Sequence, residues 1–175
     1  MEDLTGRLVI GVSSRALFDL EKENEIFLSG GIKKYREYQE AHEDEPLERG
    51  TAFYLVKSLL ELNKQANRPI VEVVVMSRNS PETGMRMLKS IDKYGLDITR
   101  VALSGGESLT KYLKAFSIDL FLSKDGTDVQ RVIDSGICAA AQIYAPPTEF
   151  NPEDSRVKIA FDADAYLRCY SDKRS

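Results

Sequence analysis

Five strand-length apolar runs alternate with helix-like segments, and this alternation constrains the fold more than any other feature of the chain. The run PIVEVVVMS at residues 69–77 is almost continuously apolar and β-branched, which is typical of a strand buried on both faces. The runs are residues 7–12, 69–77, 98–104, 118–123 and 137–144. Because strands separated by helices pair in parallel, the pattern predicts an α/β fold, an open parallel sheet of about five strands with helices on both faces.

The segments between the runs carry helix signals. Leu55, Leu59 and Leu62 repeat at helical spacing, and Ser80 with Pro81 has the pattern of an N-cap and a first helical position. The predicted helices are residues 51–67, 80–95, 108–116 and 127–136.

The polar segment from about residue 19 to residue 50 interrupts this order and is predicted to be an insertion, or flap, after the first strand. Within it, EIFLSGG at residues 25–31 suggests a short strand and a turn at Gly30 and Gly31. Residues 32–44 suggest an amphipathic helix.

Composition excludes several classes of protein. The net charge of −4 and the pI of about 5.2 argue against nucleic acid as a partner. No apolar run approaches the roughly 20 residues that cross a bilayer, so no membrane partner is expected. The acidic N-terminus lacks the basic start of a signal peptide, and the two cysteines have no metal-site spacing. These features predict a cytoplasmic protein.

The carboxyl ends of parallel strands are where such sheets bind ligands. Ser13 and Arg15 follow the first run, Ser77 follows the second, and Asp128 comes after the fourth. Lys111 stands at the start of the helix after the third run. These residues are therefore the first candidates for a site.

A further apolar run, VKIAFDADAYL at residues 157–167, leads into Asp162 and Asp164. Side chains at i and i+2 of a strand point to the same side. One carboxylate of such a pair can attack phosphorus while the other moves a proton, although aspartates at a strand end are more often a simple turn. The run also aligns with LVIGVSSRALF at residues 8–18, placing Asp162 over Ser13 and Asp164 over Arg15. The alignment suggests a tandem repeat whose second copy has only begun.

Four segments in order, at residues 12–27, 73–108, 113–123 and 157–167, resemble the cytosolic type I 5′-nucleotidases, which are haloacid-dehalogenase-like (HAD-like) phosphatases. The resemblance implies Mg²⁺-dependent hydrolysis of nucleoside 5′-monophosphates to nucleoside and phosphate. It makes Asp162 the nucleophile and Asp164 the general acid and base, both beside the metal. Ala163 stands where the family usually has glycine.

In the first copy, the resemblance puts Ser77 at the position of the phosphate-binding hydroxyl and Lys111 at that of the charge-balancing lysine. Ser13 replaces the nucleophile and Arg15 the acid and base, while Ser123 and Lys124 replace an acidic metal-binding pair. We therefore expect residues 1–145 to be a degenerate HAD-like (Rossmann-like) domain without catalysis. We expect residues 146–175 to be a linker and the first strand of a catalytic domain.

Two functions of different class remain open from the sequence. The first is a 5′-nucleotidase, of which this chain alone is expected to be inactive. The second is a non-catalytic pseudo-phosphatase module that binds a nucleotide or phosphate, or supports oligomerisation, without turnover. A homo-oligomer that pairs Asp162 of one chain with Ser77 and Lys111 of another would instead complete an active site. A receiver-like signalling domain is disfavoured, because it needs an acidic pocket where this chain has Ser13 and Ser14.

Overall fold

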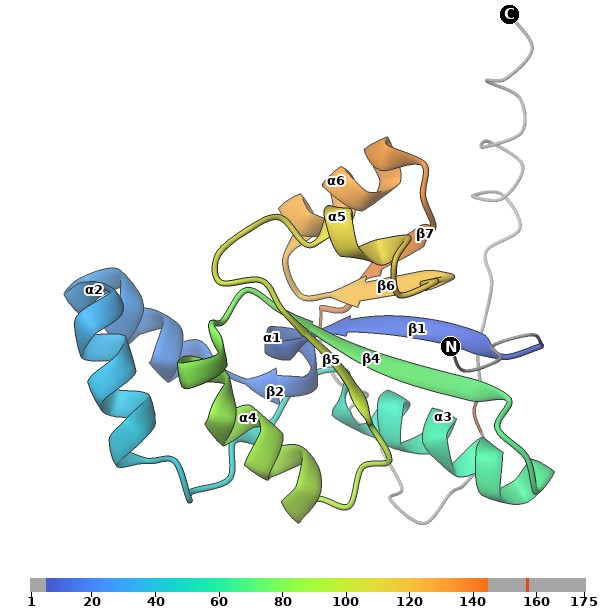
Figure 1. The fold of residues 1–175 in the computed structure, drawn as a ribbon, viewed down its shortest axis with the longest axis horizontal. Coiled ribbons are helices and arrows are strands. Elements are labelled where there is room, and N and C mark those ends of the chain that lie inside the picture. The colour runs from blue at the N-terminus through green and yellow to red at the C-terminus, as the bar shows by residue number, and fades with distance from the viewer. Residues whose placement is uncertain (1–5, 145–156, 158–175) are drawn as a thin grey trace, which may run out of the picture.

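The computed structural model describes residues 6–144 and Val157, apart from the side chains of residues 81–83. Its centre is a five-stranded parallel sheet in the order β5–β4–β1–β6–β7 (Figure 1). The strands are β1 (Leu8–Ser13), β4 (Val71–Ser77), β5 (Arg100–Leu103), β6 (Leu120–Ser123) and β7 (Ala139–Gln142). The predicted open parallel α/β sheet is confirmed.

Helices cover both faces of the sheet, as the alternation predicted. In Figure 1, α3 and α4 lie on one side, and α5 and α6 lie on the other. The helices are α1 (Ser14–Leu17), α2 (Glu21–Ala41), α3 (Phe53–Ala66), α4 (Pro81–Lys93), α5 (Thr110–Leu113) and α6 (Gly126–Ser135). α5 is shorter than expected. The sequence pattern predicted a helix over residues 108–116, and the structure has one over Thr110–Leu113.

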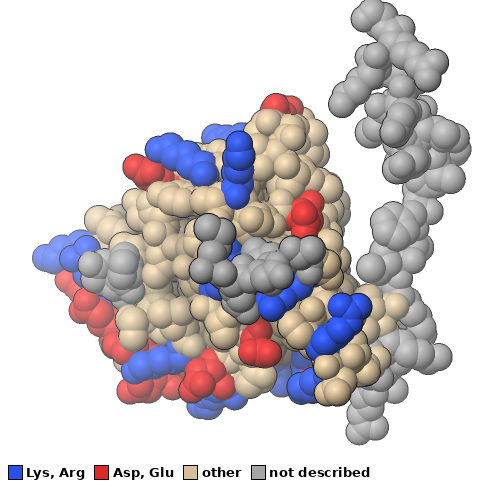
Figure 2. Space-filling view, turned by 45° about the vertical axis from the view of Figure 1, so that its right-hand side comes forward, with Lys and Arg blue, Asp and Glu red and all other residues tan. Residues whose placement is uncertain are grey.

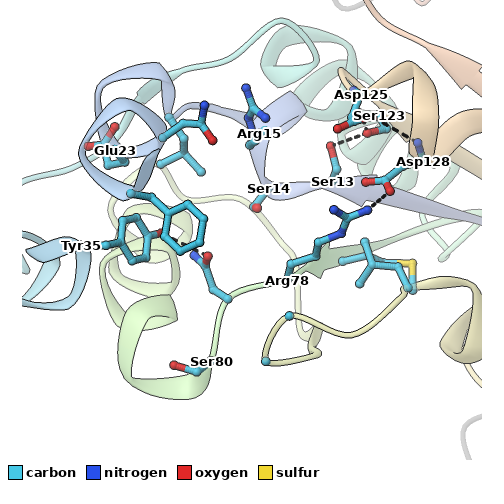
Figure 3. Close-up of a pocket in the computed structure, with 18 of the residues that line it drawn as sticks. Ser13, Ser14, Arg15, Glu23, Tyr35, Arg78, Ser80, Ser123, Asp125 and Asp128 are labelled. Atoms are coloured by element: carbon cyan, nitrogen blue, oxygen red, sulfur yellow. Dashed lines mark hydrogen bonds and ion pairs between the residues drawn. The ribbon is translucent and has the colours of Figure 1, made fainter. Parts of the chain in front are cut away.

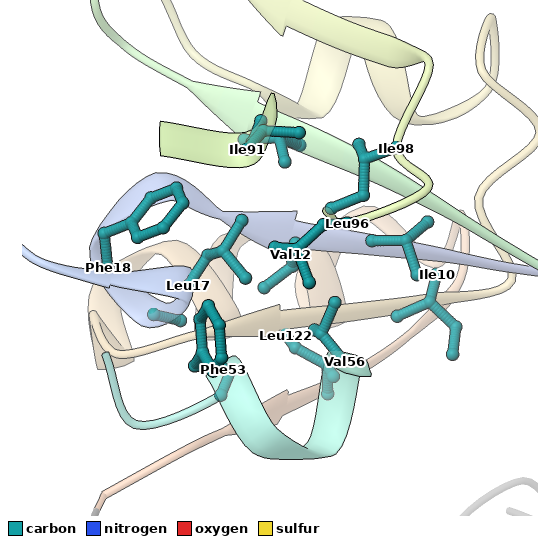
Figure 4. Packing of buried hydrophobic residues seen from close by; sticks show 14 of the residues in the cluster. Ile10, Val12, Leu17, Phe18, Phe53, Val56, Ile91, Leu96, Ile98 and Leu122 are labelled. Carbon is teal, nitrogen blue, oxygen red and sulfur yellow. The ribbon is translucent and has the colours of Figure 1, made fainter. Parts of the chain in front are cut away.

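Alternate residues of the central strands pack into two separate hydrophobic cores. Ile10 and Val12 of β1 face α3 and α4, where they pack with Val56 and Ile91 in the larger cluster (Figure 4). Val9 faces the other way, into a smaller cluster that α5 and α6 cover with Leu113 and Val132. This alternation is the period-two pattern of a strand that is buried on both faces.

β1 occupies the middle of the sheet. It pairs with β4 along Leu8–Ser13 and with β6 through Ile10 to Val12, so both of its edges are hydrogen bonded. The chain runs outward from β1 through β4 to β5 and then returns to β6 on the other side. In such sheets, ligands bind outside the carboxyl ends of the strands, at the point where the strand order reverses. Here that point lies between β1 and β6.

The segment after β1 is helical, and the expected short strand at residues 25–31 was wrong. α2 runs from Glu21 to Ala41, and Gly31 interrupts it with φ 68° and ψ −173°. The glycine pair therefore makes a kink between two helical parts instead of a hairpin turn. Lys and Glu residues favour helix on both sides of the pair, and Phe27 packs edge-to-face on Tyr35 across the kink, with ring centroids 5.9 Å apart. The helix expected at residues 32–44 is confirmed as the second part of α2.

A small second sheet anchors the chain around α1. β2 (Phe18–Asp19) pairs antiparallel with β3 (Glu48–Arg49). The Gly50 N–H donates to the Leu17 carbonyl at 2.9 Å, and the Ala52 N–H donates to the Ala16 carbonyl at 2.8 Å. These bonds fix the turn that directly follows β1.

The surface carries both signs of charge. On the face shown in Figure 2, basic and acidic side chains are interspersed, with no stripe of one sign. Among residues 6–144, no helix combines the length and the apolar character needed to span a bilayer.

Candidate functional site

A pocket of about 710 Å³ opens at the carboxyl edge of the sheet, with walls from the ends of β1, β4 and β6, the loop after β5, and α2 (Figure 3). This size lies within the roughly 300–1,000 Å³ typical of small-molecule sites. The strand ends contribute serines and charged residues, and α2 contributes Phe27, Ile32 and Tyr35 together with the polar residues Glu23, Asn24 and Arg36. The apolar and aromatic side chains that line the pocket on α2 thus face a polar wall at the strand ends.

Serine hydroxyls line the edge where β1 meets its two neighbours. Ser14 Oγ donates to Ser77 Oγ at 3.0 Å, which joins β1 to β4. Ser123 Oγ donates to Ser13 Oγ at 3.2 Å, which joins β6 to β1. All four serines are buried. The strands thus end in two hydroxyl pairs, where a cluster of carboxylates would be needed to hold a metal.

Backbone amides complete these pairs. Ser13 Oγ caps α1 by accepting from the Ala16 N–H at 3.2 Å, and Ser77 Oγ accepts from the Asn79 N–H at 3.1 Å. Ser123 Oγ accepts from the Asp125 N–H at 3.1 Å. The serines therefore shape the three turns that follow the strands.

A cluster of three charges lies beside the β1 turn. Glu21, at the start of α2, accepts from Lys124 Nζ at 2.7 Å and from Arg15 Nη2 at 3.2 Å. The hydrogen bond from Lys124, with help from Arg15, holds the pKa of the Glu21 carboxyl below its ordinary value, against the opposing effect of partial burial. Arg15 and Lys124, the expected replacements of the acid and base and of a metal ligand, thus pair with a carboxylate from α2.

The acidic residues after β6 also have partners. Asp125 Oδ1 accepts from the N–H groups of Thr127 and Asp128, and so caps α6. The Asp128 carboxylate pairs with Arg78 from the β4 turn and lies 3.7 Å from Arg131 Nη1. Figure 3 shows the Arg78 guanidinium reaching across the pocket to Asp128.

α2 covers the opposite side of the pocket. The Tyr35 hydroxyl donates to Asn79 Oδ1 at 3.1 Å, which ties the helix to the β4 turn. Burial raises the pKa of the Tyr35 phenol above its ordinary value. Behind it, Glu23 of α2 accepts from Arg86 Nη1 of α4 at 2.7 Å in a buried pair. The helix is therefore fastened over the pocket at two points.

The structure brings some predicted site residues together and leaves others apart. Ser77 lies at the edge, behind Ser14. Lys111 lies on α5 outside the pocket wall, with 65% of its side chain exposed and its amine 3.0 Å from Glu107. Its role, like that of Ser77, as a phosphate ligand stays a prediction. Asp162 and Asp164 lie outside the described residues, although nearby Val157 packs against the larger core.

The described edge does not fit Mg²⁺. This ion prefers carboxylate and water oxygens, and the strand ends offer serine hydroxyls together with the cations Arg15 and Lys124. Within residues 6–144, no three His, Cys, Asp or Glu side chains gather in a way that could hold a metal. The assignment of the metal to Asp162 and Asp164, which lie outside the described residues, stays a prediction.

The aromatic wall was missed by the sequence interpretation. Phe27 and Tyr35 were assigned to a flap, and their positions eight residues apart on either side of a glycine pair gave no helical stripe. The signal that could have found them is the helix-forming composition on both sides of Gly30 and Gly31.

Comparison with known proteins gives one family and a small set of relatives. Residues 1–173 match the model of the 5′-nucleotidase family. Human cytosolic 5′-nucleotidase 1B is 34% identical over an alignment of 166 positions that covers 91% of this chain and 27% of the human protein. The chain thus spans about a quarter of that relative's length. Two structures of the HAD domain of the effector protein Lem4 from Legionella pneumophila, one an inactive mutant, align with TM-scores of 0.45 and 0.48 at 11% and 12% identity. They cover 95% of this chain and 94% and 93% of their own.

Proposed function

The chain belongs to the 5′-nucleotidase family, and from this premise we propose that it takes part in Mg²⁺-dependent hydrolysis of nucleoside 5′-monophosphates in the cytoplasm. The observation that carries the proposal is that the family match extends to residue 173 and so includes the carboxylate pair Asp162 and Asp164. The human relative, which is named a cytosolic 5′-nucleotidase, supports both the reaction and the location.

In the proposed reaction, a carboxylate oxygen of Asp162 attacks phosphorus and forms an aspartyl-phosphate while the bond from phosphorus to the 5′-oxygen breaks. Asp164 gives its proton to the leaving 5′-oxygen, which departs as the nucleoside hydroxyl. Asp164 then takes a proton from water, which attacks the phosphoryl group, releases phosphate and restores Asp162. Mg²⁺ supplies positive charge against the phosphate and the two carboxylates.

Residues 1–145 are proposed to form a degenerate domain that takes no part in the chemical step. Ser13, at the end of β1, is the counterpart of Asp162, and its Oγ already accepts from Ser123 and from the Ala16 N–H. Among the described residues, no base is hydrogen bonded to the Ser13 hydroxyl, and the Glu21 carboxylate is paired with Arg15 and Lys124. A nucleophilic serine needs such a base.

The proposal is tested by phosphate release from AMP in a chimera in which this chain replaces the matched segment of the human relative. We expect Mg²⁺-dependent release by the chimera and none above background by the 175-residue chain alone. Asp162→Asn should lower kcat at least about a thousandfold, since it removes the nucleophile, and Asp164→Asn about a hundredfold or more.

Ser13→Ala is the matched control at the corresponding position of the first copy and should change kcat less than about twofold. Circular dichroism of each variant separates lost activity from lost folding. Undiminished turnover in Asp162→Asn would contradict the assignment, and efficient turnover by the isolated chain would contradict its expected inactivity.

A further inference from the structure

We propose that the pocket at the carboxyl edge of the described sheet binds a nucleotide without turning it over, with the phosphate at the strand ends and the base against α2. The inference concerns residues 13–128 alone and does not depend on Asp162 or Asp164. It rests on the hydrogen-bond polarity of one wall, on the neutralised carboxylates, and on the exposed aromatic surface of the other wall.

The strand-end wall has hydrogen-bond donors to spare. Ser13 Oγ accepts two hydrogen bonds and, within the described chain, donates none, so its proton is available to a ligand. Ser13 as a whole is only 7% exposed. Arg15 Nε is buried and has no partner among the residues that the structure describes. A phosphate oxygen, which only accepts hydrogen bonds, suits both groups.

Arg78 adds positive charge at the same wall. Among the described residues, Arg78 Nη2 donates to Asp128, and a guanidinium carries five donors in all. Figure 3 shows this side chain crossing the pocket between Ser14 and Asp128. The remaining donors of Arg78 are placed to meet an anion from the side opposite Arg15.

The carboxylates that line the pocket do not cancel this preference, because each is paired with a cation or accepts from backbone N–H groups. Asp125 accepts from two amides at the start of α6, and Asp128 pairs with Arg78 next to Arg131. Glu23 pairs with Arg86, which lies behind the pocket wall. A carboxylate bound to a cation or to backbone N–H groups repels an approaching anion far less than a free one.

The wall formed by α2 fits a flat ring. Phe27 lines the pocket with 44% of its surface exposed, and it is held edge-to-face against the fixed ring of Tyr35. Ile32 lines the same side and is also exposed. Aromatic side chains of this kind stack on nucleobases, which all offer a π-face. In Figure 3, Tyr35 lies on the opposite side of the pocket from Ser13 and Asp128.

Equilibrium titration of the full 175-residue chain with AMP, adenosine and inorganic phosphate tests the inference, for the native sequence and for Asp162→Asn combined with Asp164→Asn. We expect saturable AMP binding in both, with adenosine and phosphate each weaker by about tenfold or more, because each fills only one end. Arg15→Ala and Phe27→Ala should each weaken AMP binding about tenfold. Phe27→Ala should leave phosphate binding unchanged.

Lys64→Ala is the matched control, since it removes an exposed positive charge on α3 outside the pocket and should leave the affinity for AMP within about twofold. Thermal melting checks that each variant is folded.

Absence of saturable AMP binding at millimolar concentration would overturn the inference. AMP binding that disappears in the Asp162 and Asp164 variant but survives Arg15→Ala and Phe27→Ala would place the ligand elsewhere. Sensitivity to Arg15→Ala without sensitivity to Phe27→Ala would reduce the site to one for a simple anion and also overturn the inference.

Discussion

Arg86→Ala should lower the free energy of unfolding by about 3–5 kcal/mol. Arg86 Nη1 donates to Glu23 Oε1 at 2.7 Å, and Arg86 Nε donates to the Glu45 carbonyl at 2.8 Å. The side chains of Arg86 and Glu23 are 8% and 7% exposed. Removing the guanidinium leaves a carboxylate inside the protein with no compensating charge, which is the most costly way to break an ion pair. Urea denaturation of the variant and the native chain measures the change.

Two control variants distinguish the cost of leaving the Glu23 carboxylate buried without a partner from the cost of losing an ion pair in general. Glu23→Leu combined with Arg86→Met removes both charges and should recover most of the loss, because no buried ion is left alone. Lys111→Ala breaks an exposed pair with Glu107 and should cost less than about 1 kcal/mol. A loss below about 1 kcal/mol for Arg86→Ala would mean that the pair does not hold α2 against α4.

Gly50→Ala is the second change with a large expected effect, about 3 kcal/mol of destabilisation. A Cβ at this position would lie 2.5 Å from the Ala16 carbonyl oxygen and 2.7 Å from the backbone N and C of Phe18. These neighbours are main-chain atoms that cannot rotate away. The clash would push β3 and the start of α3 from the turn that follows β1, and with it the serines at the edge. Urea denaturation again gives the magnitude.

Gly126→Ala is the control for Gly50→Ala. The nearest neighbours of an added Cβ at Gly126 are the amide atoms of the Gln142 side chain, which can rotate away, and the residue begins α6 without a positive φ. Since alanine favours helix over glycine by up to about 1 kcal/mol, this variant should change the free energy of unfolding by less than about 1 kcal/mol. Equal destabilisation by the two substitutions would show that the close approach at Gly50 is not the cause.

The sheet was predictable from the sequence because strands buried on both faces have nearly continuous apolar sequences, such as VEVVVMS in β4. The kink of α2 was not predictable, because two glycines between helical segments are also typical of a turn. Only the packing of Phe27 on Tyr35 distinguishes a kinked helix from a turn here. The shortness of α5 had no local signal.

The candidate site was predictable only in part. The expected strand ends predicted Ser13 and Ser77 to lie near a site, since parallel strands end at one edge of the sheet. The bonds that they make to other serines depend on contacts between residues 63 and 110 positions apart, which no local pattern specifies. The family pattern alone predicted Lys111 as a phosphate ligand. In the structure its side chain is exposed on α5, with the amine beside Glu107.

Trapping of the covalent phosphate identifies the nucleophile directly. The chimera with the human relative is mixed with AMP labelled in its phosphate, quenched in acid and mapped by peptide. We expect label that hydroxylamine removes, as it does from an acyl phosphate, on the peptide containing Asp162, and none after Asp162→Asn. Hydroxylamine-resistant phosphate on Ser13 or Ser14 would show instead that the edge of the described sheet carries the chemistry.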